Sequence, residues 1–589
     1  MMIFPAQPML RRWSTTLVNT VTASGLLLLA AACTDEAPEI RIPTPPPDPV
    51  FMTTNVSLTA IGGFETGIFD DGAAEIVAFD PATNQMFIIN SATTTIDVVD
   101  ISQPGLLVSN GTIDASAMGG GANSIAVSGT TLAVAIEANN PQEPGLVALY
   151  DTTAPFDLIT TVTVGALPDM LTFTTDGTTL LVANEGEPND AYTVDPDGSV
   201  SIIDVSMAID AVTDTMITDE MIVSTATFER FSFPDADGSV PEDQVALPDG
   251  VRIFGPDASI AQDLEPEFIA AVGTTTAYVA LQENNAIGIL DIPSATFTNI
   301  VPLGAKDHSL EGNGFDASDR DMAIDNGDVM DGINIMQHPT MGLYQPDAIA
   351  VYSVNGQIFI ATANEGDTRD YDGFSEEARV DDLTLDATVF PNAAELQMEQ
   401  NLGRLQTTTV DGDTDGDGAV ETIFSIGARS FSIFDTAGNL IFDSGDDFER
   451  ITAERIPANF NSNNDENGSF DSRSDNKGPE PEGIALLQID QQIFAFIGLE
   501  RVGGIMIYDV SNPAEPIFQD YINTRNFDVD AENPDGSTNS AVADLGAEGL
   551  VAIPADSSPT GTPLLLVANE VSGTTRIFQV MFDTIEVTQ

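Results

Sequence analysis

The residues of this chain that could do chemistry are carboxylates at matching positions in repeated β-rich segments. Equivalent residues of a repeat occupy equivalent places in a fold, so we expect a quasi-circular array. Like charges this close raise each other's pKa unless cations or N–H groups compensate. The array therefore predicts either a ligand site lined by bound cations or carboxylates that tie neighbouring repeats by accepting N–H bonds from turns. Segments end at Glu137, Glu185, Glu283, Glu365, Glu500 and Glu570, and others begin at Glu75, Asp169, Glu267, Asp347, Glu482 and Glu548.

A second acidic motif has the spacing of a calcium loop. Aspartates alternate from Asp411 to Asp417, and Gly416 follows the third of them. This arrangement puts several oxygens around one hard cation, and the glycine permits the sharp turn. Thr422 stands where an EF-hand loop would carry its closing glutamate, so Glu421 would have to serve in a shifted geometry. We expect calcium here, with an acidic surface turn as the alternative. The candidate ligands are Asp411, Asp413, Asp415, Asp417 and Glu421.

Basic residues are scarce, yet several stand beside these carboxylates. Guanidinium groups among carboxylates form ion pairs or bind phosphate or carboxylate in a bidentate way. Arg369, Arg429, Arg473 and Lys477 are the candidate anion-binding set, with ion pairing alone as the alternative. We expect one ligand face to bring together Glu365, Arg369, Arg429, Arg473, Lys477, Glu482, Glu500 and Arg501.

Several common catalytic and metal motifs are missing from the sequence. The only histidines are His308 and His338, and a Ser-His-Asp site would depend on one of them. The sequence contains no Gly-x-Ser-x-Gly elbow, no paired-cysteine metal motif, no HExxH and no phosphate-cradling glycine loop. No catalytic residue is assigned from the sequence.

The elements that position these residues form a cassette that recurs seven times. The clearest copy spans residues 168–204 and contains three short strands rich in Val, Ile, Leu and Phe. A unit this short cannot bury its own apolar faces, so the copies must pack on one another. We predict an all-β fold, a seven-bladed β-propeller with long loop insertions. Helices are expected only in the insertions, for example around residues 392–402, and ring closure is expected to use residues 55–64 or 582–587.

The composition is strongly acidic. Asp and Glu total 92 against 18 Lys and Arg, which gives a formal net charge of -74. Such a surface repels DNA, RNA and anionic lipid headgroups, so we expect no nucleic-acid partner. The acidity suits solubility in a salty medium, or divalent cation binding, or both.

The N-terminus carries an export signal. Arg11 and Arg12 precede an apolar run that ends in three alanines and Cys33, the only cysteine. We expect residues 1–32 to be a signal peptide, Cys33 to be acylated, and residues 33–50 to be a proline-rich linker before a propeller at residues 51–589. Lipid anchoring to the cell envelope, at the outer membrane, follows. An ordinary signal peptide with a coincidental cysteine is the alternative.

The chain resembles the choice-of-anchor I family of exported bacterial proteins. The matching stretches include Val182-Ala-Asn-Glu-Gly-Glu-Pro188, Asp263-Leu-Glu-Pro-Glu267, Ala363-Asn-Glu-Gly-Asp-Thr-Arg369, Gly427-Ala-Arg-Ser-Phe-Ser-Ile433 and Phe470-Asp-Ser-Arg-Ser-Asp-Asn-Lys-Gly-Pro-Glu-Pro-Glu-Gly483. The resemblance implies a seven-bladed, YVTN/WD40-like propeller at the cell envelope. Related domains occur in a mesenchyme-specific cell-surface glycoprotein, and some members carry an alkaline-phosphatase label.

Together these features predict a lipid-anchored propeller that binds a small-molecule ligand or protein partner, with Ca²⁺ and no organic cofactor. A metal-dependent phosphoesterase is the first alternative, in which carboxylates would hold an ion that activates water while arginines neutralise the phosphate. A structural surface protein is the second.

Overall fold

The computed structural model describes residues 50–70, 72–206, 209–210, 215–216, 221–235, 237–320, 322–325, 328–330 and 332–587. The chain divides into two units, Met1–Pro49 and Val50–Gln589. The predicted signal peptide, the acylated Cys33 and the linker up to residue 49 lie outside the described residues.

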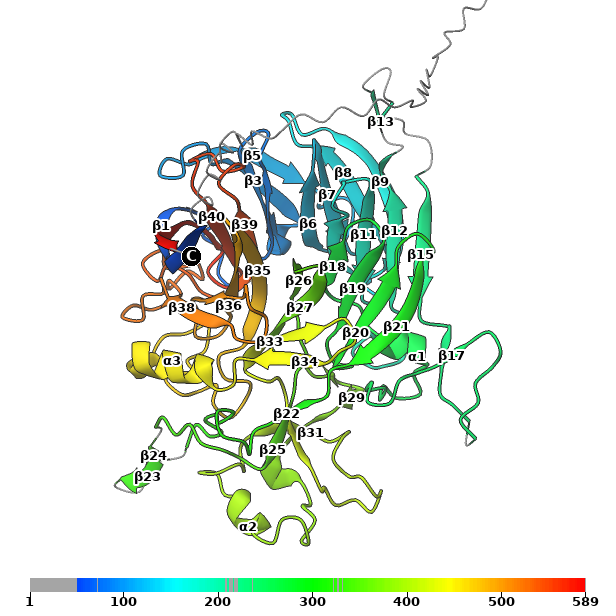
Figure 1. Cartoon of the computed structure of the whole chain (residues 1–589), viewed down its shortest axis with the longest axis vertical. Coiled ribbons are helices and arrows are strands. Elements are labelled where there is room, and N and C mark those ends of the chain that lie inside the picture. The colour runs from blue at the N-terminus through cyan, green and yellow to red at the C-terminus, as the bar shows by residue number, and fades with distance from the viewer. Residues whose placement is uncertain are drawn as a thin grey trace, which may run out of the picture. The chain divides into compact units, whose positions relative to one another are not determined.

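Within the described residues, the second unit contains seven four-stranded antiparallel sheets, one for each sequence copy (Figure 1). The all-β propeller class predicted from the sequence is confirmed. From the innermost strand outward, the first four sheets are β2 (Val77–Asp80), β3 (Gln85–Asn90), β4 (Thr95–Asp100) and β5 (Val108–Asp114); β6 (Ala122–Ser128), β7 (Thr131–Ile136), β8 (Pro144–Asp151) and β9 (Leu158–Ala166); β10 (Pro168–Phe173), β11 (Thr179–Asn184), β12 (Ser199–Asp204) and β15 (Val223–Thr227); and β18 (Ile269–Val272), β19 (Thr276–Leu281), β20 (Ala286–Asp291) and β21 (Thr296–Pro302). The last three are β26 (Ile349–Val354), β27 (Gln357–Asn364), β33 (Ser430–Asp435) and β34 (Leu440–Asp443); β35 (Pro481–Ile489), β36 (Gln492–Leu499), β37 (Ile505–Asp509) and β38 (Ile517–Ile522); and β39 (Ala547–Ile553), β40 (Leu564–Asn569), β41 (Thr574–Val587) and β1 (Val50–Glu65).

The seven sheets close into a ring. The innermost strands contact one another in the cycle β2, β6, β10, β18, β26, β35, β39 and back to β2. Strand β1 pairs antiparallel with β41, with Ser57 opposite Met581 and Ala60 opposite Phe578. Both predicted closing segments take part, since residues 55–64 lie in β1 and residues 582–587 lie in β41. They do not face each other, because residues 57–65 lie opposite residues 574–581 and residues 583–587 lie opposite residues 50–54. The two strands together complete the seventh sheet.

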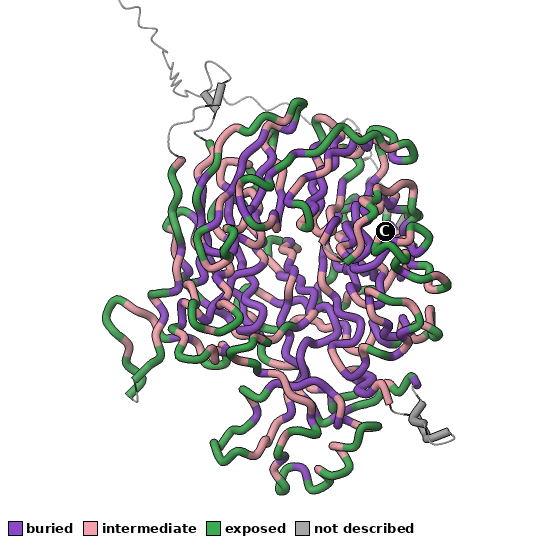
Figure 2. The backbone as a smooth tube through the Cα atoms, turned by 180° about the vertical axis from the view of Figure 1, so that it is seen from behind, coloured by how far each residue is buried: buried purple, intermediate pink, exposed green. Residues whose placement is uncertain are grey.

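The second strand of each sheet explains why the copies need one another. All six residues of β3 and all six of β40 are buried, because both faces of the sheet pack on neighbouring sheets. Between the first and second sheets, for example, Phe87 and Ile89 share a core with Leu132 and Val134. Figure 2 shows the buried residues following the strands and the exposed ones gathering in loops.

The long insertion in the fifth sheet, between β27 and β33, contributes to a smaller layer of its own. Its core contains Phe315, Val380, Leu402 and Ile423. This layer is a five-stranded sheet of β22 (Ala305–Asp307), β25 (Thr340–Leu343), β32 (Ile423–Ser425), β31 (Gln406–Thr408) and β30 (Glu377–Arg379). Two-stranded pieces are β13 (Ile209–Asp210) with β14 (Thr215–Met216), β16 (Phe231–Ser232) with β17 (Val245–Ala246), β23 (Met322–Asp325) with β24 (Asp328–Met330), and β28 (Asp370–Tyr371) with β29 (Phe374–Ser375).

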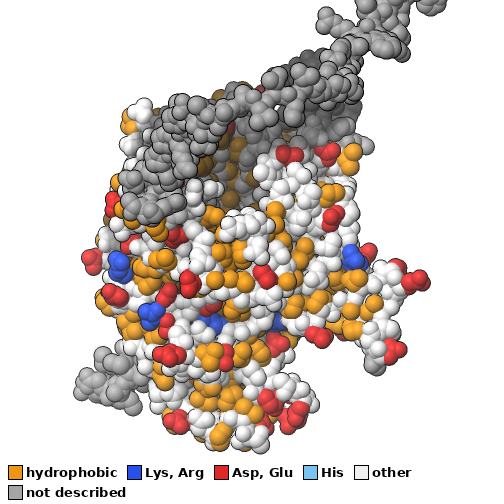
Figure 3. Space-filling view, in the orientation of Figure 1, with side chains coloured by type: hydrophobic (Ala, Val, Ile, Leu, Met, Phe, Trp, Pro, Cys, Tyr) orange, Lys and Arg blue, Asp and Glu red, His pale blue; other side chains and the backbone are white. Residues whose placement is uncertain are grey.

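Helices are short and lie between the propeller strands. The α-helices are α1 (Ile260–Asp263), α2 (Ala393–Leu396) and α3 (Asp447–Arg455), and α2 falls in the region predicted to be helical. Among the described residues, no helix is long and apolar enough to cross a membrane. In Figure 3 acidic side chains are spread over the visible face and basic ones are few.

Candidate functional site

Strand pairing brings the two carboxylate series to one end of the propeller. In the third sheet Pro168 pairs with Asn184, so that Asp169 and Glu185, which follow them, lie at the same end of the sheet. In the sixth sheet Pro481 pairs with Leu499, so that Glu482 and Glu500, which follow them, also lie at this end. Because the first strand begins where its antiparallel neighbour ends, all copies deliver their carboxylates to this same end. We call it the channel mouth.

Local backbone irregularities aim these side chains. The register of the inner strand shifts between Pro168 and Leu171, and again between Pro481 and Ile484, as β-bulges do. The residue before each proline is left-handed: φ is 45° at Leu167 and 51° at Glu480. The carbonyls of these two residues accept the backbone N–H groups of Glu185 and Glu500 at 2.9 and 2.8 Å. Such conformations cost about 1–3 kcal/mol in non-glycine residues and persist only where the surroundings fix them.

A central cavity of about 440 Å³ opens from the channel mouth and is lined from all seven inner strands. Its acidic lining includes Glu75, Asp169, Asp347 and Glu548, which lie at or just before the starts of their strands. Farther along the strands the lining is apolar, with side chains that include Met170, Phe173, Phe268, Ile349 and Leu550. The cavity is therefore lined by carboxylates at the channel mouth and mainly by apolar side chains farther in.

Three basic side chains at the channel mouth converge on one buried carboxylate, Glu480. Its Oε1 accepts Arg473 Nη2 at 2.7 Å, and its Oε2 lies 3.1 Å from both Lys477 Nζ and Arg501 Nε. Burial alone would raise the pKa of Glu480, but the three cations outweigh it and lower the pKa to about 2. We call Arg473, Lys477 and Arg501 the cation belt. Lys477 also reaches Glu365 at 2.8 Å, and Arg501 reaches Glu500 at 3.1 Å.

The predicted residue Arg369 lies at the channel mouth too, but it is completely buried in ion pairs. Its guanidinium contacts Asp263 at 2.6 Å and Glu265 at 2.8 Å, with no exposed side-chain surface. Its guanidinium also lies 4.5 Å from the ring centre of Phe254. The guanidinium of Arg252 contacts the same ring at 4.3 Å. Arg369 is therefore committed to protein carboxylates.

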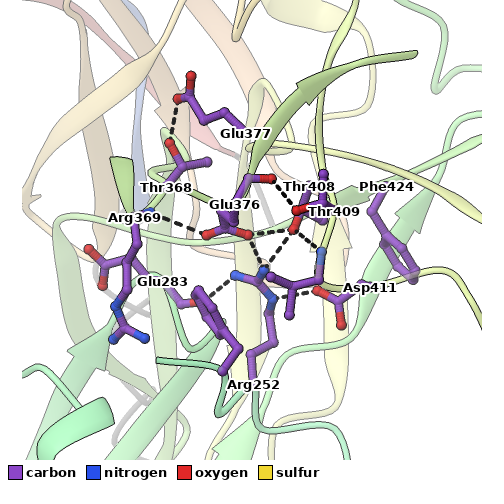
Figure 4. A network of polar contacts seen from close by, with 12 residues as sticks. Arg252, Glu283, Thr368, Arg369, Glu376, Glu377, Thr408, Thr409, Asp411 and Phe424 are labelled. Carbon is purple, nitrogen blue, oxygen red and sulfur yellow. Dashed lines mark hydrogen bonds and ion pairs between the residues drawn. The ribbon is translucent and has the colours of Figure 1, made fainter. Parts of the chain in front are cut away.

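Arg252 joins the insertion to the channel mouth, as Figure 4 shows. Its guanidinium lies between Glu376, with which it forms an ion pair, and Asp411, which it contacts at 2.7 Å. The same guanidinium donates to the backbone carbonyl of Glu283 at 2.5 Å. The position of Glu283 is thus tied to the first aspartate of the predicted calcium loop.

Negative charge at the channel mouth exceeds what these cations compensate. One buried carboxylate oxygen has no hydrogen-bond partner, within the described part of the chain, in each of six residues: Glu265, Glu267, Glu283, Glu482, Glu500 and Glu548. Burial, followed by repulsion from Glu75 and Glu570, raises the pKa of Glu548 well above its ordinary value. Burial likewise raises the pKa of Glu75 to about 8, although a hydrogen bond from Ser91 opposes the shift. Metal-free, the mouth holds carboxylates that resist ionisation.

Three groups of carboxylates here have ligand oxygens within 4.8 Å of one another. They are Glu185, Glu267 and Glu283; Asp347, Glu365 and Glu482; and Glu365, Glu480 and Glu500. Clusters of carboxylate oxygens are the ligands that calcium and magnesium prefer.

A family model for the choice-of-anchor I domain matches residues 75–513, most of the propeller. The chain belongs to the choice-of-anchor I family. This membership, with the fold, supports a propeller protein of the cell surface. A curated relative, Gigasin-3a of Magallana gigas, is 33% identical over 194 residues, which cover 31% of this chain and 66% of that protein.

Several solved structures align with most of this choice-of-anchor I chain at low sequence identity. Hydrazine synthase of Kuenenia stuttgartiensis has a TM-score of 0.39 and 12% identity, covering 88% of this chain and 97% of that one. The Cps50 (Swd1) β-propeller domain of Myceliophteria thermophila has a TM-score of 0.40 and 9% identity, covering 89% and 100%. The RRP9 WD40 repeats have a TM-score of 0.41 and 9% identity, with the same coverages.

The predicted calcium loop of this choice-of-anchor I chain brings four of its five candidate ligands together. The ligand oxygens of Asp413, Asp415, Asp417 and Glu421 lie within 4.8 Å of one another. The nearby Asp417 carboxylate raises the pKa of Asp415. Asp411 lies outside this group, since it pairs with Arg252.

Arg429 contacts the segment that carries Arg473 and Lys477, but its carboxylate partner is Glu449 and not Glu480. Its Nη1 contacts Glu449 at 2.7 Å, and its guanidinium donates to the carbonyls of Asp316, Ser474 and Asn476 at 2.8, 2.8 and 2.5 Å. It stacks on Phe315 at 4.4 Å. This geometry is that of a structural ion pair. The structure therefore brings Glu365, Lys477, Glu500, Arg473 and Arg501 together around Glu480, with Glu482 close to Glu365. Arg369 pairs separately with Asp263 and Glu265.

Neither histidine is placed for acid–base catalysis. Burial lowers the pKa of His338 to about 4, and that of His308 falls well below its ordinary value for the same reason. Both rings pack on Phe315, and their nitrogens contact the backbone oxygens of Phe315 and Asn313.

Sequence reasoning missed Glu265 and Glu480 as partners of the cations. A signal was present, since the tripeptide Glu-Pro-Glu occurs at residues 265–267 and again at 480–482. In both places the first glutamate pairs with basic side chains and the second stands at the channel mouth. The carboxylate before the repeat position thus neutralises arginine or lysine, and the repeat position itself is left without a cation.

Proposed function

We propose that this protein is an exported, envelope-held β-propeller that binds divalent cations, calcium first, at its channel mouth and takes up a ligand or protein partner through them. The observation that carries this proposal is the set of six buried carboxylate oxygens at the channel mouth that lack a hydrogen-bond partner in the described part of the chain. Buried charges are normally paired or coordinate metals, because desolvation is costly. A divalent cation would supply the missing charge.

The coordination chemistry explains how an ion would capture a ligand. Calcium takes about 6–8 oxygen ligands, so three carboxylates leave positions for water or for acidic groups of a ligand. Arg369 and the cation belt already pair with Asp263, Glu265 and Glu480. An anionic group that enters the channel mouth would therefore bind the metal ion, because these basic side chains already form ion pairs with protein carboxylates.

The calcium loop supports a second ion, outside the mouth. We infer that an ion held by Asp413, Asp415, Asp417 and Glu421 orders the insertion in the fifth sheet. Its effect would reach the channel through Asp411 and Arg252, which contacts the backbone of Glu283.

Envelope attachment rests on the sequence and on the family. The lone Cys33 after an apolar run supports acylation, and the prolines that follow it would hold the propeller away from the membrane. The net charge of -74 argues against any nucleic-acid partner.

Calcium titration of the chelator-treated full chain, by calorimetry and thermal melting, tests the proposal. A ligand that binds only the folded state stabilises it by about 2.7 kcal/mol at a concentration 100 times Kd. We expect the melting temperature to rise with calcium, and an unchanged melting curve with no binding heat would overturn the proposal. Calcium-dependent hydrolysis of a phosphomonoester by the same sample would select the phosphoesterase alternative, in which the mouth-bound ion activates water.

A further inference from the structure

The three carboxylate groups at the channel mouth differ in how they are compensated. The group of Asp347, Glu365 and Glu482 contains Glu365, which Lys477 contacts at 2.8 Å. The group of Glu365, Glu480 and Glu500 lies within the whole cation belt. In both groups, basic side chains already compensate part of the negative charge that would attract a metal ion.

The third group, Glu185, Glu267 and Glu283, has no such partner among the described residues, and we call it the triad. Glu267 and Glu283 are 8% and 4% exposed, and each has one buried oxygen without a hydrogen-bond partner. The guanidinium of Arg369 is held by Asp263 and Glu265. That of Arg252, which contacts the triad only at the backbone oxygen of Glu283, is held by Glu376 and Asp411. The triad is thus a buried acidic pocket with open acceptor oxygens.

We propose that the triad is a binding site for one divalent cation of the calcium type. This inference rests on the proposed function, and it assigns the cation-binding site to one of the three carboxylate groups at the channel mouth. The triad oxygens lie within 4.8 Å of one another. An ion with metal–oxygen distances of about 2.3–2.6 Å spans at most about twice that distance, so a single ion can contact all three carboxylates.

The ligand type selects the class of metal. The triad offers only carboxylate oxygens, whereas zinc and copper sites are rich in imidazole and thiolate. Magnesium demands oxygens at about 2.0–2.1 Å in a near-ideal octahedron and keeps several waters. Calcium tolerates irregular sets of oxygens, which suits three glutamates from two different sheets.

The site would join neighbouring parts of the propeller. Glu185 follows β11 of the third sheet, whereas Glu267 precedes β18 and Glu283 follows β19 of the fourth. An ion shared by these residues would therefore cross-link the two sheets at the channel mouth. Asp169 and Asp347 line the cavity that opens from the channel mouth, so a ligand in that cavity could complete the coordination shell.

The experiment removes one triad carboxylate at a time in the full chain whose calcium loop carries Asp413→Asn and Asp415→Asn. Calcium binding to the chelator-treated parent and to Glu267→Gln and Glu283→Gln is measured by calorimetry and by metal content after dialysis. We expect one ion per chain in the parent. Each glutamine variant should bind it at least about tenfold more weakly, since even outer-shell changes cost about 10–100-fold.

Controls separate this inference from the proposed function. Glu143→Gln, at an exposed position, should bind like the parent. If the parent binds no calcium, the proposed function fails. If the parent binds calcium and both triad variants bind it equally well, the triad assignment fails while the function stands. If Glu482→Gln loses the ion while the triad variants keep it, the site belongs to the second group and the triad assignment is again overturned.

Folding of the variants is checked without metal. Glutamine replaces a buried, repelled carboxylate by a neutral side chain of the same shape, so the metal-free variants should melt no lower than the parent. Should one variant fail to fold, Glu185→Gln at the partly exposed position gives the same test.

Discussion

Replacing Glu480 by glutamine should destabilise the protein by roughly 3 kcal/mol at pH 7. The cation belt lowers the pKa of this buried carboxyl from 4.5 to about 2. A difference of about 2.5 in pKa, at about 1.36 kcal/mol for each step of one, corresponds to roughly 3.4 kcal/mol of stabilisation of the folded state. A direct estimate agrees, because breaking a buried pair costs about 3–5 kcal/mol.

The pH dependence of this effect has a defined sign. The folded-state pKa of Glu480 is lowered, so its contribution is complete above the unfolded value of 4.5 and is lost as the pH falls toward about 2. At pH 3 the contribution should have fallen to roughly 1.4 kcal/mol. Urea unfolding of wild type and Glu480→Gln at pH 7 and pH 3 measures both values.

Two results would refute this reasoning. A loss below about 1 kcal/mol at pH 7 would mean that Arg473, Lys477 and Arg501 gain little from Glu480. An equal loss at pH 7 and pH 3 would mean that packing, not charge, is responsible. Glu143→Gln provides the matched control, and as an exposed substitution it should change stability by less than about 0.5 kcal/mol.

Three further predictions concern the charges of the molecule, and a fourth concerns its lipid anchor. Metal-free protein should lose stability as the pH rises from about 5 to 8, because burial raises the pKa of Glu75 to about 8 and the folded state then binds protons that the unfolded chain has released. Arg429→Ala should cost about 3–5 kcal/mol in urea unfolding, since its ion pair and carbonyl contacts are buried. Asp413→Ala with Asp415→Ala should reduce the rise of melting temperature with calcium. Cys33→Ser should abolish palmitate labelling and membrane fractionation.

Each of these predictions has its own contradicting outcome. If the free energy of unfolding of chelator-treated protein rises between pH 5 and 8, buried protonated carboxylates do not determine its pH dependence. Arg429→Ala should be compared with Arg320→Ala, whose side chain is 42% exposed, and equal losses would show that burial of Arg429 is not decisive. An unchanged calcium response would eliminate the loop, and unlabelled wild type that still fractionates with membranes would eliminate acylation.

The fold followed from the sequence because the repeat is local. Each copy contains its own strands. Apolar runs such as residues 564–568 are buried, and their composition alone is enough to predict buried strands. Pairing of β1 with β41 joins residues more than five hundred positions apart. The sequence offered residues 55–64 and 582–587 only as alternatives because nothing local shows that the two strands containing them pair with each other.

The candidate site was predictable only in part. Glu185, Glu283 and Glu500 could be placed at one end because strand ends repeat along the sequence. The direction of each basic side chain depends on partners far away in the chain. Arg252 lies 159 positions before Asp411, so the loss of this aspartate from the predicted calcium group could not be foreseen.

Long-wavelength anomalous diffraction from crystals grown with calcium chloride tests the central claim most directly. The account predicts a calcium peak about 2.3–2.6 Å from carboxylate oxygens of Glu185, Glu267 and Glu283 at the channel mouth. A map with no calcium peak anywhere at the channel mouth, while the protein is saturated with the ion in solution, would contradict it.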